Sequence, residues 1–98
     1  MIARFKIEGH SMEPAIEAGQ HFFVSRLSKP RLNDIVVLKD MEKEMFLVKR
    51  VKAELENGNF LVEGDNIGHS RKFSVKKEQI VGKLSFCYWP LKNFGFVK

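Results

Sequence analysis

Five stretches rich in β-branched and aromatic residues, separated by turn signals, constrain the fold more than any other feature of this sequence. They are HFFVSRL (21–27), DIVVLK (34–39), MFLVKRVKA (45–53), NFLVE (59–63) and IVGKLSFCYW (80–89). Such stretches are typical of β-strands, and helical periodicity is nearly absent. The sequence therefore predicts a small, mostly β fold whose sheet is mostly antiparallel.

The connections between these stretches agree with antiparallel pairing. KDMEKE (39–44) is short and charged and predicts a hairpin loop, while ENGN (56–59) carries the Asn-Gly signal of a tight hairpin turn. MEPAIEAGQ (12–20) is the one segment in which we expect a short helical turn, with Ser11 or Met12 near its start. We therefore expect at most one such turn in an otherwise β fold.

The chain has 98 residues and a single cysteine, Cys87. A chain of this length buries roughly two thirds of its unfolded surface, so we expect residues 1–98 to form one domain. With no possible internal disulfide and no Cys and His cluster of zinc-like spacing, packing must hold the fold.

No stretch has the about 20 apolar residues of a membrane-spanning helix, and MIARFKIEGH (1–10) lacks the apolar core of a secretory signal. We expect a cytoplasmic protein, or a membrane-associated one if the native chain has an anchor that this sequence lacks.

The charge balance is basic. Seventeen Lys and Arg against twelve Asp and Glu give a net charge of +5. The basic residues are spread through turns and strand ends, with no run longer than the pair at 76 and 77. This distribution favours a solvated basic surface over a nucleic-acid site, although anionic partners are attracted by such an excess.

EGHSMEPAIEAGQ (8–20) places Ser11 in a glycine-bounded turn, and two interpretations compete for it. A Ser followed by Glu and Pro is a good helix N-cap, and the window by itself favours this role. A catalytic role requires a base elsewhere in the chain, because a serine hydroxyl is a weak nucleophile until its proton is removed.

The histidines offer no triad. His10 adjoins Ser11 and would tend to point away from it, His21 opens a strand, and His69 lies in a loop without a clear carboxylate partner. A lysine is the other candidate base. Its ordinary pKa is about 10.4, so it must lie in an apolar setting that disfavours its charged form.

Strand alternation within 45–53 places Lys49 on one face with four apolar residues, Met45, Leu47, Val51 and Ala53. Lys83 is its nearest rival, but a glycine precedes Lys83 and its strand face is more polar. The alternative is a Lys49 at a strand edge that extends its amine to water. Spacing alone does not decide between these two interpretations.

GHSMEPAIEAGQ, followed in order by NDIVVLK, FLVKRV, VEGDN, SRKFSVKKEQIVGK and YWPLKNFGFV, resembles the motif set of the type I signal peptidase family. These are serine proteases with a Ser/Lys dyad. The resemblance runs from Gly9 to the C-terminus. Soluble members such as the maturation proteases of nickel superoxide dismutase are similar in size. The resemblance implies the all-β fold shared with the catalytic domain of LexA-type repressors.

Applied residue by residue, the resemblance implies that Ser11 is the nucleophile and Lys49 the general base. The Ser11 backbone N–H would help to bind the oxyanion. The remaining implied residues are Gly9, Met12 and Pro14 at the oxyanion site and cleft, and Asp65, Asn66, Ser70 and Arg71 as site support, with Ser70 orienting the Lys49 amine.

The implied reaction is endoproteolysis of a precursor or leader peptide, bound as an extended strand and cut after small residues. This chemistry needs no metal or cofactor. The aromatic tail FCYWPLKNFGF (86–96) is either core or a contact for a membrane surface or a membrane-bearing partner.

Two alternatives remain. A LexA-like or UmuD-like domain cleaves its own chain, but only ten residues precede Ser11, which leaves little chain to cut. A small nucleic-acid-binding module is suggested by KNFGFVK (92–98), which is close to an element that stacks single-stranded bases on aromatic side chains. That element belongs in a central strand beside a second aromatic strand. Here the stretch follows Pro90 and occupies the last seven residues of the sequence, so we do not expect a nucleic-acid partner.

Overall fold

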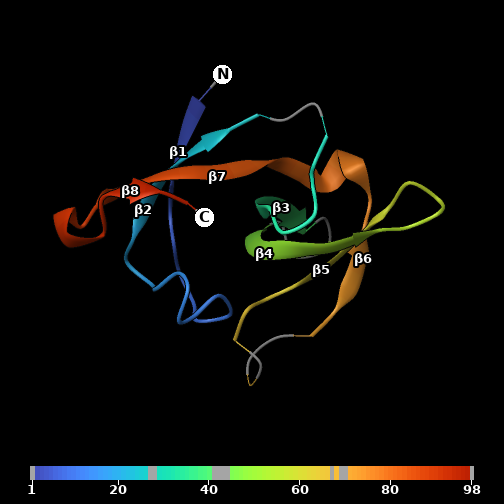
Figure 1. The fold of residues 1–98 in the computed structure, drawn as a ribbon, viewed down its shortest axis with the longest axis horizontal. Helices are drawn as coiled ribbons and strands as arrows, with labels where there is room; N and C mark the ends of the chain where they lie inside the picture. The colour runs from blue at the N-terminus through green and yellow to red at the C-terminus, as the bar shows by residue number, and fades with distance from the viewer. Residues whose placement is uncertain (1, 27–28, 41–44, 67, 69–70, 98) are drawn as a thin grey trace.

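A computed structural model of the chain describes residues 2–26, 29–40, 45–66, 68 and 71–97. Within these ranges the chain forms strands joined by turns and short 3₁₀ helices (Figure 1). The strands are β1 (Ile2–Lys6), β2 (His21–Ser25), β3 (Ile35–Asp40), β4 (Met45–Glu54), β5 (Phe60–Glu63), β6 (Phe73–Val75), β7 (Ile80–Trp89) and β8 (Gly95–Phe96). The 3₁₀ helices are η2 (Lys77–Gln79) and η3 (Leu91–Asn93).

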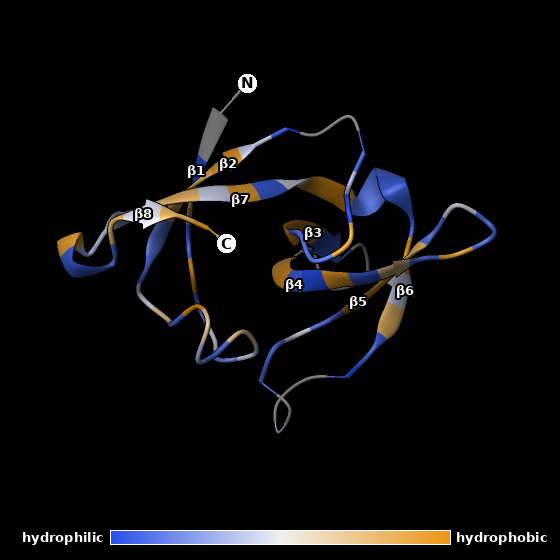
Figure 2. Cartoon of the chain, viewed as in Figure 1, coloured by the Kyte–Doolittle hydropathy of each residue, from blue (hydrophilic) through white to orange (hydrophobic). Residues whose placement is uncertain are grey.

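The strands of the described ranges form one sheet in the order β1-β2-β7-β3-β4-β5-β6, with β8 paired to β7. Each strand pairing is antiparallel. The predicted mostly β, antiparallel fold class is confirmed. Bands of opposite hydropathy alternate along β4 and β7 (Figure 2), as expected when successive side chains point to opposite faces of a strand.

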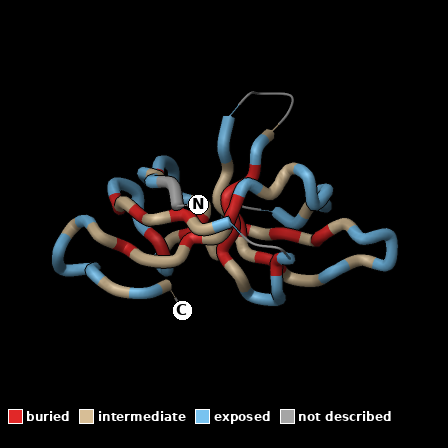
Figure 3. The backbone as a smooth tube through the Cα atoms, turned by 90° about the horizontal axis from the view of Figure 1, so that it is seen from above, coloured by how far each residue is buried: buried red, intermediate tan, exposed pale blue. Residues whose placement is uncertain are grey.

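Two clusters of buried residues make up the core, and β3 contributes to both. Ile35 and Val37 belong to one cluster, which also contains Met12, Phe22 and Leu84. The second cluster takes Val36 and Leu38 from the same strand and adds Val51, Phe60, Val62 and Val75. Because β3 packs on both faces, its apolar run is continuous instead of alternating. Buried segments gather in the middle of the molecule in Figure 3.

The five predicted strands are present with small shifts at their ends. β7 has the predicted bounds, β3 and β5 begin one residue later than predicted, and β4 extends to Glu54. β2 ends at Ser25 instead of residue 27, which lies outside the described ranges.

The short strands β1, β6 and β8 were not predicted from the sequence. Each has five residues or fewer, so local composition gives a weak signal for it. Tertiary pairing with β2, β5 and β7 respectively supplies the hydrogen bonds that define these strands.

The predicted turn at 56–59 closes the hairpin between β4 and β5. The Leu55 N–H donates to the Asn59 carbonyl at 2.8 Å, and the Gly58 N–H donates to the Leu55 carbonyl at 3.0 Å. Gly58 has φ of 85°, a conformation that glycine adopts at little cost. The loop predicted at 39–44 joins β3 and β4, and its residues 41–44 lie outside the described ranges.

The segment after β1 forms turns and no α-helix. One helix-like bond is present in this segment, from the Ile16 N–H to the Met12 carbonyl at 3.0 Å, whereas the 3₁₀ helices η2 and η3 lie at 77–79 and 91–93, where no helical turn was predicted. The interpretation of Ser11 as a helix N-cap is wrong, because no helix begins there. Among the helices of the described residues, none has the length and apolar character needed to cross a bilayer.

Candidate active site

Ser11 and Lys49 line the same open cleft, a cavity of about 720 Å³. One wall runs from Arg4 in β1 to Met12 in the following turn, and the other is the first half of β4, from Met45 to Lys49. The structure therefore brings the two predicted catalytic residues to one concave surface from distant parts of the sequence.

The cleft lies between β1 and residues 45–48 of β4, and each of these segments has one edge that no strand of the described residues covers. β1 is the first strand in the sheet order, with β2 on its inner side, and β5 pairs with β4 only from Arg50 onward. The Phe5 and Phe46 rings meet edge to face with centroids 6.2 Å apart, and both residues line the cleft. An edge strand can pair with an added extended chain.

The turn that carries Ser11 is fastened to the core and to the strands around it. Met12 and Ile16 are buried in the first core cluster. Backbone bonds close the base of this loop, from the Ile7 N–H to the Gln20 carbonyl at 2.8 Å and from the Gly19 N–H to the Ile7 carbonyl at 2.9 Å. Ser11 itself is half-buried.

Asn66, in the loop after β5, holds the Ser11 turn from the other side. Its backbone N–H donates to the Ser11 carbonyl at 2.8 Å, and its side-chain amide donates to the His10 carbonyl at 2.9 Å. The predicted support residue thus contacts the backbone of the candidate nucleophile and of the residue before it.

Lys49 is buried, with 8% of its surface exposed. It pairs across the sheet with Val36, which is fully buried, and Val51 on its own strand face is also buried. Desolvation lowers the pKa of Lys49 below its ordinary value, because burial penalises the charged form. The alternative of a Lys49 that extends to water does not hold.

Lys83, the rival lysine, has a different environment. Its Nζ lies 3.1 Å from the Asp34 carboxylate, and about a third of its side chain is exposed. Lys83 is thus held in an ion pair, and it does not line the cleft that contains Ser11.

Asp65 pairs with Arg50, a residue that sequence reasoning did not assign to the site. The guanidinium donates from Nε at 2.9 Å and from Nη2 at 2.7 Å to the two carboxylate oxygens, and Nη1 donates to the Asn33 carbonyl at 3.0 Å. The hydrogen bond to Asp65 raises the pKa of Arg50. This bidentate pair ties the loop after β5 to β4 beside Lys49. An arginine inside an apolar strand next to the candidate base was the signal for it.

The remaining predicted site residues differ in whether they line the cleft that contains Ser11 and Lys49. Gly9 lines the cleft and has φ of 81°. Pro14 is exposed and follows Glu13 through a cis peptide bond. Arg71 is exposed, and the position predicted for Ser70 lies outside the described ranges.

The histidines of the described ranges form no triad with Ser11. His10 lines the cleft, but its Nδ1 lies 2.8 Å from Glu13 Oε2. His21 packs against Tyr88 with ring centroids 5.7 Å apart. His69 is outside the described ranges.

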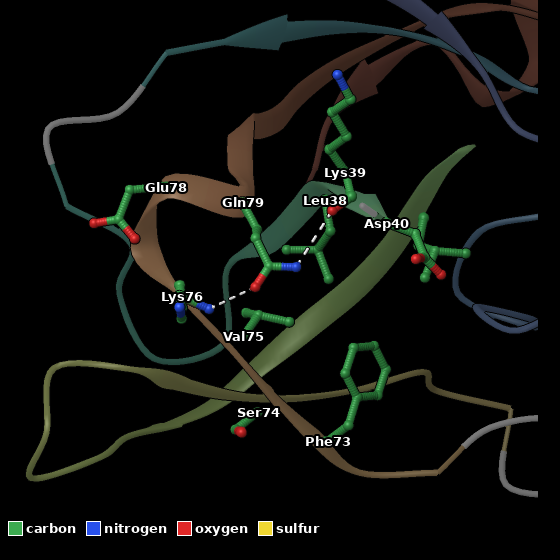
Figure 4. A pocket seen from close by; sticks show the side chains of 10 residues that line it. Leu38, Lys39, Asp40, Phe73, Ser74, Val75, Lys76, Glu78 and Gln79 are labelled. Atoms are coloured by element: carbon green, nitrogen blue, oxygen red, sulfur yellow. Dashed lines mark hydrogen bonds between the residues drawn. The ribbon is translucent and has the colours of Figure 1, made fainter. Parts of the chain in front are cut away.

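A second cavity, of about 650 Å³, is lined by the end of β3, the start of β4, the strand β6 and the 3₁₀ helix η2 (Figure 4). Its walls include Leu38, Phe73 and Val75, and Gln79 closes one side by donating to the Lys39 carbonyl at 3.4 Å and accepting from the Lys76 N–H at 3.0 Å. None of the residues predicted for catalysis lines it.

Comparison with known proteins gives one family. A family model described as Peptidase S24-like matches residues 2–85, a span from β1 into β7 that includes Ser11, Lys49, Asp65 and Asn66. No match to a curated protein was found. The match confirms the resemblance at the level of the group that unites S24 peptidases, LexA-type proteins and signal peptidases, and it agrees with the antiparallel β fold. The chain belongs to the Peptidase S24-like family.

Proposed function

We propose that the protein is a serine endopeptidase in which Ser11 is the nucleophile and Lys49 the general base. The observation that carries this proposal is the shared cleft, in which Ser11 lines one wall and a buried lysine with a lowered pKa lines the other. A base near neutral pH must be uncharged to accept a proton, and desolvation favours that form of Lys49.

The reaction proceeds in two stages. Ser11 Oγ attacks the peptide carbonyl carbon while Lys49 Nζ takes the hydroxyl proton, giving a tetrahedral oxyanion. The C–N bond then breaks, Lys49 returns the proton to the leaving amine, and an acyl-enzyme ester remains on Ser11. Water, deprotonated by the neutral Lys49, hydrolyses the ester and regenerates the serine.

The turn that carries Ser11 also supplies the proposed hydrogen-bond donor to the oxyanion. The Ser11 backbone N–H is the proposed donor, and a fixed donor stabilises the developing charge without reorganising during the reaction. The bonds from Asn66 to the Ser11 and His10 carbonyls hold this turn in place. Gly9, which has positive φ, lines the same cleft as Ser11.

The proposed substrate is a precursor or leader peptide that enters the cleft as an extended strand. The outer edge of β1 and the edge of residues 45–48 in β4, which no strand of the described residues covers, are suited to pairing with such a peptide. Phe5 and Phe46 touch across the cleft, so we expect small residues, such as alanine, before the cut.

Cleavage assays on matched variants test the proposal. We expect the protein to cleave peptides with Ala-x-Ala before the scissile bond, and Ser11→Ala and Lys49→Met each to reduce the rate by at least about a thousandfold. Ser74→Ala and Lys83→Met are the controls, because Ser74 is exposed outside the cleft and Lys83 is ion-paired; both should retain activity.

Mass spectrometry of a peptide library detects cleavage without assuming the sequence cut, and far-UV circular dichroism verifies that each variant is folded. Full activity in Ser11→Ala or Lys49→Met would refute the dyad. Cleavage of the protein's own chain, seen as a Ser11-dependent loss of intact mass, would instead support the LexA-like alternative.

A further inference from the structure

β1 carries two cationic side chains along the wall of the cleft that contains Ser11. Arg4 and Lys6 both line this wall, and both are exposed. Neither forms an ion pair with another of the residues that the structure describes. These two positive charges are therefore available to a bound group of opposite charge.

The register of β1 with β2 shows which way these side chains point. Phe5 lies opposite Phe22, which is buried, and Phe5 packs against the same core cluster. Because successive side chains of a strand point to opposite faces, Arg4 and Lys6 point away from this core cluster. The two cations thus share one face of β1, at alternate positions.

A peptide strand added at the outer edge of β1 places its own side chains alternately on the two faces. No strand of the described residues covers that edge. Side chains directly opposite each other on paired strands point to the same face, so every second residue of the peptide lies beside Arg4 or Lys6, whichever direction the peptide runs. The intervening residues lie on the side of Phe5, where the proposed function requires small side chains.

The other charges at the cleft do not cancel this pair of cations. Residues 45–48 on the opposite wall are uncharged. Among the described residues that line the cleft, Glu8 is the acidic one, but it lies beyond the end of β1 at Lys6. His10 is already bonded to Glu13. Opposite charges at facing positions of paired strands attract and like charges repel, so the edge of β1 favours carboxylates.

We propose that the cleft selects an acidic peptide, with carboxylate side chains at two alternate positions that face Arg4 and Lys6 and a small residue between them. This inference rests on the proposed function, because it names the substrate class of the same cleft. One pair of opposite charges on facing strands strengthens binding by up to about fivefold. Two pairs together should favour carboxylates over uncharged side chains by about tenfold.

Binding to the Ser11→Ala protein tests this selectivity without requiring cleavage. Three labelled peptides of alternating residues, Ala with Glu, Ala with Gln and Ala with Lys, are compared by fluorescence anisotropy at low salt. We expect the Glu peptide to bind about tenfold more tightly than the Gln peptide, and the Lys peptide to bind most weakly. Added salt should reduce these differences.

The spacing of the carboxylates separates recognition at two positions from attraction to net charge. A peptide in which pairs of Ala alternate with pairs of Glu has the same composition as the alternating Glu peptide. As an extended strand it presents only one Glu to Arg4 and Lys6 and turns another toward Phe5. It should therefore bind more weakly than the alternating Glu peptide.

Charge reversal on β1 tests the two cations directly. Arg4→Glu combined with Lys6→Glu, in the Ser11→Ala protein, should make the Lys peptide bind more tightly than the Glu peptide. Arg31→Glu combined with Lys77→Glu is the matched control, because both residues are exposed and neither is among those that line the cleft. This control changes the net charge equally and should keep the preference for Glu. Far-UV circular dichroism verifies that both variants are folded.

Failure of any of the peptides to bind, or equal binding of the Glu and Gln peptides, would overturn the proposal. Equal binding of the two Glu peptides, or loss of the preference in the Arg31 and Lys77 control, would assign the attraction to net charge and overturn it as well. Cleavage of Ala-x-Ala peptides without a preference for Glu would leave the peptidase function standing and remove this inference. Selective binding by an unmodified protein that cuts no peptide would do the reverse.

Discussion

The amine of a solvent-exposed lysine is protonated at neutral pH, yet the fold places Lys49 among apolar strand neighbours. Val36 lies opposite it in register and is fully buried, and Lys49 itself is 8% exposed. Burial of an amine favours its neutral form and is costly while the amine is charged. The same desolvation that suits Lys49 to act as a base is therefore expected to reduce the stability of the fold.

Replacing Lys49 by methionine should stabilise the protein. The folded state binds fewer protons at Lys49 than the unfolded state between the lowered pKa and the ordinary value of 10.5, so the free energy of unfolding of the unmodified protein rises with pH across that window. The gain from Lys49→Met should be largest below the lowered pKa and shrink as pH rises through the window. Thermal unfolding measured from about pH 6 to about pH 10 checks this, since 1 kcal/mol corresponds to roughly 4–8 °C in a domain of this size.

Lys83→Met is the matched substitution. It removes the ion pair with Asp34, so no pH-dependent gain is expected from it. A Lys49→Met protein that is less stable than the unmodified protein at every pH would contradict the account of Lys49 as a costly buried amine.

At the scale of elements, the site is assembled where the turn after β1, the strand β4 and the loop after β5 meet. Asn66 joins the loop to the Ser11 turn through the Ser11 and His10 carbonyls. The bidentate pair between Arg50 and Asp65 joins the same loop to β4. Both connections end within one residue of Ser11 or Lys49, so this loop sets the position of both candidate catalytic residues.

Asn66→Ala should reduce catalysis more than stability. It removes the side-chain bond to the His10 carbonyl but keeps the backbone bond to Ser11, and the net cost of one exposed hydrogen bond is about 0.5–1.5 kcal/mol. We expect kcat to fall about tenfold with little change in KM, because the Ser11 turn loses its alignment while the peptide-binding edges are untouched.

Asn57→Ala is the control for that substitution. The Asn57 side chain also makes one hydrogen bond to the backbone, but its Oδ1 accepts from the Asn59 N–H at 3.0 Å, in the hairpin between β4 and β5. If both variants lose stability and activity in parallel, Asn66 has only a structural role.

At the scale of the whole molecule, the two core clusters share β3 and are expected to unfold together. Residues Ile35 to Leu38 alternate between the clusters along one continuous strand. Loss of packing in either cluster therefore removes support from the strand that both use. Small domains of this size usually unfold in one cooperative step.

Leu84→Ala in the first cluster and Leu38→Ala in the second should each cost about 2–5 kcal/mol, because both leucines are almost completely buried. In each variant the unfolding transition followed by Trp89 fluorescence should coincide with that followed by far-UV circular dichroism. Leu38→Ala tests the coupling more stringently. Trp89 ends β7, whose residues Leu84 and Cys87 belong to the first cluster, whereas Leu38 belongs to the second cluster. Two separate transitions in that variant would show that the clusters unfold independently.

Local sequence determined the five longer strands and the turn at Gly58. Strand propensity and glycine conformation act within a few residues, so they can be read from composition and order. The order of the motifs pointed to the type I signal peptidase family, and the comparison confirmed the broader Peptidase S24-like family. The short strands β1, β6 and β8 were not predictable in the same way, because their hydrogen bonds come from partners distant in sequence.

The arrangement of the site depended on tertiary structure. Spacing left Lys49 undecided between a buried and an exposed position, and only the packing of β4 against β3 made it buried. Arg50 was visible in the sequence as an arginine within an apolar strand, but its pairing with Asp65 and the contact of Asn66 with the Ser11 turn could not be read from it. Desolvation and hydrogen bonding depend on which groups lie next to one another, and in this protein the folding of the sheet brings together residues from the turn after β1, from β4 and from the loop after β5.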